Sequence, residues 1–298
     1  MKKAILILTI LFSVSVITQV GAATVVAVDA TSLGVADGTS ITSLSNSGTA
    51  GDFSTSIGTV TAASHPSNNN AAVSIQGAAF SSSKMISTNS QATTGLTGNA
   101  PYTVRAWVWN EAFGNEEAHL SWGHRGGPLG SNAGFHQGVH PTFGAIGHWG
   151  GGAVGDPNEP DVGWGPPGVG TEILGTEARW ANLAYVYDGT TDFVYIDGML
   201  SASEAHPNGL DYHTTFNDGS DTFIALGSES DAGNNNSAPI PFSGTIARSE
   251  VFDTAMSDAQ ILASFNAEKP LFFDGIPEPS SAILALLGFL GLTIRRRR

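Results

Sequence analysis

Two Asp-Gly pairs that stand nine residues apart constrain the fold of this chain more than any other feature of its sequence. The pairs are Asp188-Gly189 and Asp197-Gly198, and the segments before them are residues 182–187 and 192–196. Asp and Gly accept the positive φ that tight hairpin turns require. The two segments are rich in β-branched and aromatic residues, which favour strands. Turns at this spacing predict an antiparallel all-β sandwich.

A second segment, residues 102–109, alternates with the period of a strand. One predicted face holds Tyr102, Val104, Ala106 and Val108, and the other holds Thr103, Arg105, Trp107 and Trp109. One short helix is expected late in the chain, where Ser257 and Gln260 have the spacing of a capping box before an apolar stripe. Since no repeat of 20–50 residues is visible, solenoids and propellers are disfavoured.

Composition limits the chemistry of the chain. There is no cysteine, which excludes disulfides, thiolate nucleophiles and zinc–thiolate sites. Residues 24–275 hold six Lys and Arg against 25 Asp and Glu, a net charge of about −19. A chain this acidic cannot form the basic patch that nucleic acid requires. The charge permits divalent cations and also keeps an exported protein soluble.

The N-terminus has the pattern of a signal peptide, which we place at residues 1–23. Lys2 and Lys3 precede the apolar stretch 4–17, which is short for a membrane span, and small residues follow at 21–23. The alternative is an uncleaved anchor. Either way, we expect an exported chain. Removal of both ends leaves roughly 250 residues, which fits one large β-sandwich better than two small domains.

The C-terminus, residues 276–298, has an apolar stretch and a basic cluster in the opposite order from the N-terminus. Pro277, Glu278 and Pro279 precede an apolar run at 282–294, and Arg295, Arg296, Arg297 and Arg298 end the chain. Basic residues stay on the cytoplasmic side of a membrane. The basic residues at both ends therefore predict that the part of the chain between them lies outside the cytoplasm. The tail resembles the PEP-CTERM sorting signal of bacterial envelope proteins. That resemblance implies a short transmembrane helix, processing by an exosortase, and delivery to the cell surface or to exopolysaccharide.

Several segments between residues 24 and 275 resemble LamG-like members of the concanavalin A-like lectin/glucanase superfamily. They are residues 102–109, 180–189, 194–198 and 242–248, followed by 256–261. The resemblance implies a two-sheet jelly roll that binds glycan or protein. The sequence departs from the family at residues 181–182, where a histidine often follows the tryptophan, and at residues 255–256, where leucine is commoner.

The segment between Trp122 and Trp164 has the composition of a carbohydrate site. Tryptophan faces stack on sugars, polar side chains bond hydroxyls, and glycines allow a close approach. The predicted ligand-binding residues are His124, Arg125, His148, Trp149, Asp161 and Trp164. We expect them to converge on a shallow cleft at one rim of the sandwich. The alternative is that Trp122, Trp149 and Trp164 are core residues and that His124 and Arg125 are solvated loop residues.

Metal and catalytic sites are weaker hypotheses. Oxygen ligands gather near Glu229, Asp231 and Asn234, which makes Ca²⁺ the candidate cofactor. The spacing of a calcium loop is missing, and many such residues serve turns instead. A zinc pair at His136 and His140 is disfavoured because glycines and a proline break any helix there.

We therefore expect a non-catalytic protein of the cell surface or matrix whose partner is extracellular polysaccharide. The first alternative is a structural or adhesion component of the envelope that binds protein. The second is a glycoside hydrolase of the same fold, which would need two suitably spaced carboxylates. Glu159-Pro160-Asp161 lacks a second glutamate and has a proline in its middle, which suits a central strand poorly.

Overall fold

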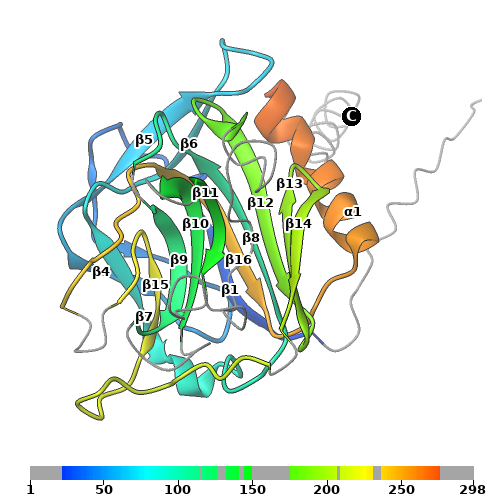
Figure 1. Ribbon diagram of the computed structural model, residues 1–298. Helices are drawn as coiled ribbons and strands as arrows, with labels where there is room; N and C mark the ends of the chain where they lie inside the picture. Colours follow the sequence, from blue (N-terminus) through cyan, green and yellow to red (C-terminus); the bar gives the residue numbers. More distant parts are fainter. Residues whose placement is uncertain are drawn as a thin grey trace, which may run out of the picture.

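Residues Tyr102–Trp109 form strand β8, with the bounds that the alternation predicts, and all eight residues are buried. The computed structural model describes residues 22–114, 116–125, 132–140, 144–149, 175–206, 209–230 and 236–275. Within these ranges the chain forms two antiparallel sheets (Figure 1). The predicted all-β antiparallel sandwich is thus confirmed. The sorting tail lies outside the described residues, as does the predicted signal peptide apart from residues 22 and 23.

The larger sheet has nine strands, in the order β14-β13-β12-β8-β16-β6-β5-β2, with β1 also paired to β16. Its strands are β1 Thr24–Asp29, β2 Ser40–Ile41, β5 Val60–Pro66, β6 Ser74–Ala79, β8, β12 Trp180–Tyr187, β13 Thr191–Ile196, β14 Met199–Ala205 and β16 Thr245–Phe252. The smaller sheet has seven, in the order β11-β10-β9-β15-β7-β4-β3. They are β3 Ser43–Leu44, β4 Phe53–Ile57, β7 Lys84–Ser90, β9 Ala118–Gly123, β10 Asn132–His140, β11 Gly144–Trp149 and β15 Phe223–Leu226.

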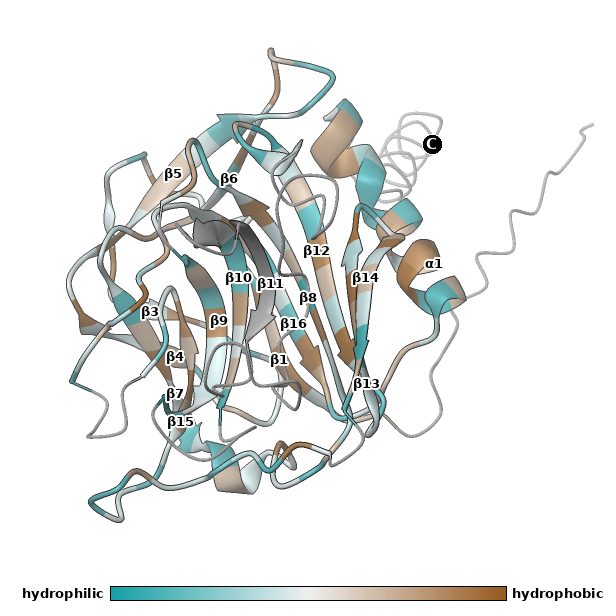
Figure 2. Cartoon of the chain, in the orientation of Figure 1, coloured by the Kyte–Doolittle hydropathy of each residue, from teal (hydrophilic) through white to brown (hydrophobic). Residues whose placement is uncertain are grey.

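The main core lies between the two sheets. The predicted inner face of β8 packs there against Leu120 and Trp122 of β9 and Phe135 of β10. Tyr102 stands edge-on to the Trp122 ring, with ring centroids 4.9 Å apart. Figure 2 shows hydrophobic residues, in brown, interrupted by paler and hydrophilic ones along the strands, as expected for sheets that pack through one face.

The outer face of β8 is also covered, by the C-terminal helical segment. Helix α1 spans Asp258–Lys269, and a π-helical turn, η3, follows at Pro270–Asp274. Trp107 stacks on Phe272 of η3, with ring centroids 4.0 Å apart. Arg105 is buried beside it and pairs with Glu250 and with Glu268 of α1, each at 3.0 Å. Figure 1 shows α1 alongside β13 and β14, and its buried residues Ile261 and Phe265 pack on the outer face of the larger sheet.

The local turn and capping signals also predicted structure correctly. The hairpin of β12 and β13 pairs Leu183 with Ile196 and Tyr187 with Asp192. In its turn Gly189 adopts φ 99°, and in the next turn, between β13 and β14, Asp197 adopts φ 51° and Gly198 adopts φ 79°, as tight hairpin turns require. Ser257 and Gln260 form the predicted capping box of α1. A short 3₁₀ turn, η1, occupies Gln91–Thr93. None of the helices in the described ranges has the length and hydropathy to cross a membrane.

Replacement of either buried outer-face tryptophan should destabilise the fold. We expect Trp107→Ala and Trp180→Ala each to lower the free energy of unfolding by roughly 3–5 kcal/mol, because both rings are fully buried and contact Phe272. Urea unfolding followed by circular dichroism would measure this. Leu262→Ala, at a position of α1 that is 40% exposed, is the control and should change stability little. A loss below 1 kcal/mol in both tryptophan variants would contradict the packing described.

Candidate functional site

Three neighbouring strands of the smaller sheet bring much of the predicted site to one end of the sandwich. β10 pairs with β9 so that Asn132 stands opposite Gly123 and Gly134 opposite Ser121. β10 also pairs with β11, which places Trp149 opposite Gly134 and His148 opposite Phe135. His124 and Arg125 directly follow β9. The register therefore places the backbone of Trp149 near the sheet end from which Arg125 extends.

Arg125 belongs to a group of charged side chains that we call the Arg125 cluster, made of Glu116, Arg125, His136 and Glu229. Nε of Arg125 lies 3.2 Å from Oε2 of Glu229, and one of its terminal nitrogens lies 3.9 Å from Oε2 of Glu116. The Arg125 side chain is 27% exposed, whereas that of Glu229 is 1% exposed. The guanidinium thus reaches the surface from a buried carboxylate that fixes its position.

His136 connects the two glutamates of the Arg125 cluster. Its Nε2 lies 2.9 Å from Oε1 of Glu229, and its Nδ1 contacts the backbone carbonyl of Glu116. A carbonyl oxygen can only accept, so Nδ1 carries a hydrogen. The other contact then requires one proton between Nε2 and the Glu229 carboxyl. The ring is fully buried, so this proton is shielded from water.

The local backbone is shaped to admit the Arg125 cluster. At Gly134 a Cβ atom would come within 2.0 Å of Oε1 of Glu229 and 2.7 Å of Nε2 of His136, so only glycine fits there. Glu116 adopts φ 57°, which is uncommon for a residue with a side chain. The glycine at position 134 thus leaves room for the carboxylate of Glu229 beside β10.

A second buried polar group lies beside the cluster. The carboxylate of Glu117 accepts hydrogen bonds from the Asn110 amide at 2.6 Å and from the backbone N–H groups of Gly114 and Ser243 at 2.9 and 3.0 Å. Its backbone oxygen accepts from the N–H of Gln137 at 2.9 Å. The two adjacent glutamates therefore have different roles. Glu116 lies near Arg125, whereas the Glu117 carboxylate accepts hydrogen bonds that hold neighbouring loops together.

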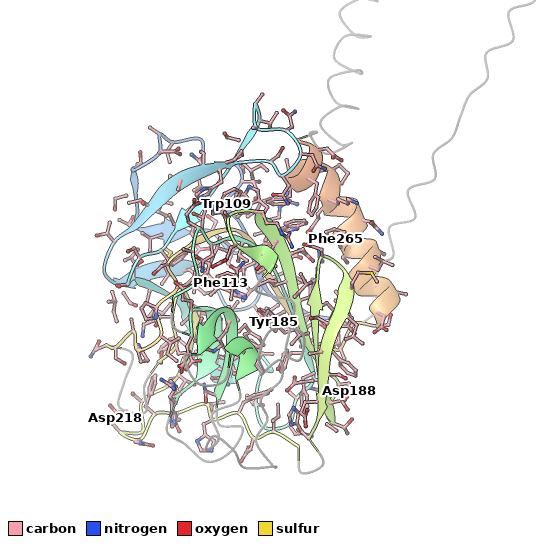
Figure 3. All side chains as sticks on the ribbon, turned by 45° about the horizontal axis from the view of Figure 1, so that its top comes forward. Trp109, Phe113, Tyr185, Asp188, Asp218 and Phe265 are labelled. Carbon is pink, nitrogen blue, oxygen red and sulfur yellow. The ribbon has the colours of Figure 1, made fainter. Side chains whose placement is uncertain are left out.

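His119 is a further buried histidine of this region. Burial, aided by the nearby His136, lowers its pKa from 6.5 to about 3. Its Nε2 lies 3.4 Å from the hydroxyl of Tyr185, and that hydroxyl donates to the backbone oxygen of His136 at 2.7 Å. Figure 3 labels Tyr185 near the middle of the domain. His119 therefore contributes no charge to the site at neutral pH.

Of the six predicted ligand-binding residues, only Arg125 has a described and partly exposed side chain. His124 is buried, with its ring near His213 and Phe216 at 5.6 and 5.8 Å. For His148 and Trp149 the structure describes the backbone position in β11. Asp161 and Trp164 lie outside the described residues. Trp122 is buried in the core, as the alternative interpretation expects.

The candidate calcium ligands are only partly described. Glu229 faces Arg125 and His136, so its carboxylate already has two basic neighbours. Asp231 and Asn234 lie outside the described residues. Among the residues that the structure describes, no group of three or more His, Asp or Glu side chains has the geometry to hold a metal ion.

His136 is the residue that the sequence interpretation missed in this role. In the sequence it stands out only as half of a disfavoured zinc pair with His140, and its partner Glu229 lies 93 residues away. One local signal is present in the sequence, namely the glycine two positions before His136. It does not identify the partner, because that requires the pairing of β15 with β9.

Removal of the buried carboxylate should be costly. We expect Glu229→Ala to lower the free energy of unfolding by about 3–5 kcal/mol, because it leaves two basic groups without their shared partner. Glu204→Ala, at an exposed position of edge strand β14, is the matched control and should stay within about 0.5 kcal/mol. Denaturant melts of both variants would measure the difference. Equal free energies of unfolding for the two variants would show that the Arg125 cluster does not stabilise the fold.

Comparisons with known proteins give distant similarities of fold. No family model and no curated protein matches this chain. Domain 4 of an extracellular arabinanase from Geobacillus stearothermophilus, in complex with arabinotriose, is 17% identical, with a TM-score of 0.43, over 69% of this chain and 87% of that domain. An arabinofuranosidase is 14% identical, with a TM-score of 0.49, over 77% of this chain and 51% of its own. A Trypanosoma rangeli sialidase is 12% identical, with a TM-score of 0.45, over 82% of this chain and 33% of its own. These scores are too low to carry an argument about ligand or chemistry.

Proposed function

We propose that this chain is an exported, non-catalytic glycan-binding protein whose binding surface is the rim around Arg125. The observation that carries the proposal is the position of the Arg125 side chain, which reaches the surface while a buried carboxylate holds it from behind. A fixed guanidinium presents hydrogen-bond donors without losing side-chain entropy on binding. The backbone of Trp149 lies two strands away in register at the same sheet end, and a tryptophan there would supply a stacking face.

The net charge of the protein and the open shape of the rim indicate which glycans it would bind and how tightly. The net charge of about −19 over residues 24–275 opposes polyanions and nucleic acid. A rim with few hydrogen bonds leaves most of a sugar in water, so we expect dissociation constants of about 10 μM to 1 mM, or about −4 to −7 kcal/mol. Many copies at a cell surface would then hold polysaccharide through avidity.

The cellular location of the protein is part of the proposal, and it is inferred from the sequences of the two chain ends. We assign residues 1–23 as the signal peptide, 24–275 as the LamG-like domain and 276–298 as the PEP-CTERM sorting signal. Purified surface protein should begin near Ala23 or Thr24 and lack Arg295–Arg298, because both ends carry processing signals. Mass spectrometry of the mature termini measures this. Intact arginines on surface protein would contradict exosortase processing, and membrane anchoring through the tail would then replace release.

Binding should depend on the rim. Arg125→Ala and Trp149→Ala should each weaken binding of soluble polysaccharides, measured by affinity electrophoresis, by at least fivefold. Arg248→Ala, on β16 and paired with Asp29, is the matched control and should bind as the unmodified protein does. Melting curves would confirm that each variant is folded. Unchanged binding in both rim variants would refute the rim as the binding surface, and release of reducing ends from the polysaccharide would identify a glycoside hydrolase instead.

An edge strand favours the alternative of a protein partner. β14 is the last strand of the larger sheet, and its Met199 and Leu200 are 64% and 49% exposed. Exposed edge strands with apolar residues pair with other chains. Cross-linking that recovers proteins through β14, together with no polysaccharide binding, would favour an adhesion component of the envelope over a glycan-binding protein.

A further inference from the structure

A cleft of about 450 Å³ opens on the opposite sheet from the Arg125 cluster, at the end of β8. We call it the Trp109 cleft. Its walls include Asn68, Asn69, Trp109, Arg179, Asp197 and Phe273. Figure 3 labels Trp109 near the place where the β5–β6 connection and the C-terminal helical segment approach each other. The volume lies within the range of small-molecule sites.

Hydrogen bonds join three distant segments to form the Trp109 cleft. The amide group of Asn68 donates to the backbone oxygen of Trp180 and accepts from its N–H, both at 2.8 Å. The N–H groups of Asn68 and Asn69 donate to the backbone oxygens of Phe272 and Phe273 at 3.0 and 2.6 Å. The walls are therefore fixed before any ligand arrives, which limits the entropy that binding costs.

The side chains of the cleft combine aromatic and polar surfaces. Trp109 stacks on His65, with ring centroids 4.6 Å apart, which holds the indole in place. Arg179 pairs with Asp197 at 2.9 Å and donates to the backbone oxygens of Gly175 and Trp180. The Arg179 and Asp197 side chains are 29% and 23% exposed, so both ions are fixed and still reach solvent.

We propose that the Trp109 cleft is a second glycan site, which takes a neutral sugar residue of a polysaccharide chain. The inference rests on the proposed glycan-binding function and adds a site to it. Sugar hydroxyls both donate and accept, and therefore match a fixed guanidinium beside a carboxylate. An apolar sugar face matches the partly exposed Phe273 ring, beside the buried Trp109 that also lines the cleft. With one site on each sheet, a single copy would join two polysaccharide segments.

The charges of the cleft select against acidic sugars. Asp197 neutralises Arg179, so the guanidinium has no excess charge for a uronate. Asp274 also lies nearby, since its carboxylate accepts from the Asn69 amide at 3.1 Å. A ligand carboxylate would therefore meet two protein carboxylates and one compensated cation, whereas a hydroxyl would meet no such repulsion.

Filling the cleft is the sharpest test. Ala71 lines the cleft at an exposed position, and its neighbour Ala72 is exposed without lining it. Ala71→Trp should weaken binding of galactomannan and xyloglucan, as neutral probes, by at least tenfold in affinity electrophoresis. Ala72→Trp should stay within twofold of the unmodified protein. Asn69→Ala, at an exposed position, is the second variant if Ala71→Trp fails to fold, and should weaken binding by at least threefold.

The outcomes separate this site from the rim around Arg125. Weaker binding in Ala71→Trp supports the cleft whatever Arg125→Ala does. Binding that falls in Arg125→Ala and is unchanged in Ala71→Trp overturns the cleft and keeps the proposed function. Binding of alginate alone, or competition by alginate that matches the neutral probes, overturns the assignment to neutral sugars. If no polysaccharide binds the unmodified protein, both the cleft and the proposed function fail.

Discussion

The fold depends on a central strand that is buried on both faces. All eight residues of β8 are buried, although alternate residues face different layers. One face packs into the core between the sheets, and the other packs against α1 and η3, where Trp107 stacks on Phe272. With no cysteine in the chain, burial of apolar surface must supply the stability that disulfides give many small domains. The C-terminal helical segment is thus part of the sandwich.

Local signals in the sequence predicted the elements but could not predict what covers them. The alternation of residues 102–109, the two Asp-Gly turns and the capping box at Ser257 each depend on neighbours a few residues away. The stacking of Trp107 on Phe272 joins residues 165 positions apart. Two tryptophans and an arginine lie on the face that this segment covers. The sequence contained no periodic signal that identified the covering segment.

The geometry of the Arg125 cluster is harder to predict than the fold, because its residues come from segments far apart in the sequence. The sequence predicts Arg125 as a glycan ligand and offers Glu229 as a candidate calcium ligand. In the structure they are partners, because β15 pairs with β9 and brings their flanking loops together. Only the sheet topology could reveal that one charge serves the other, and that His136 shares the same carboxylate.

Backbone strain connects the Arg125 cluster and the Trp109 cleft to the end of β8. Among the described residues, four that are not glycine have a positive φ, and Glu116 and Ala178 are two of them. Such conformations cost of order 1–3 kcal/mol and persist where the surroundings fix them. Asn110, the residue after β8, supplies that constraint on both sides. Its backbone oxygen accepts from the N–H of Ala178 at 2.8 Å, and its amide donates to Glu117, the neighbour of Glu116, at 2.6 Å. The residue that directly follows the buried strand therefore contacts the backbone or a neighbouring residue at both proposed sites.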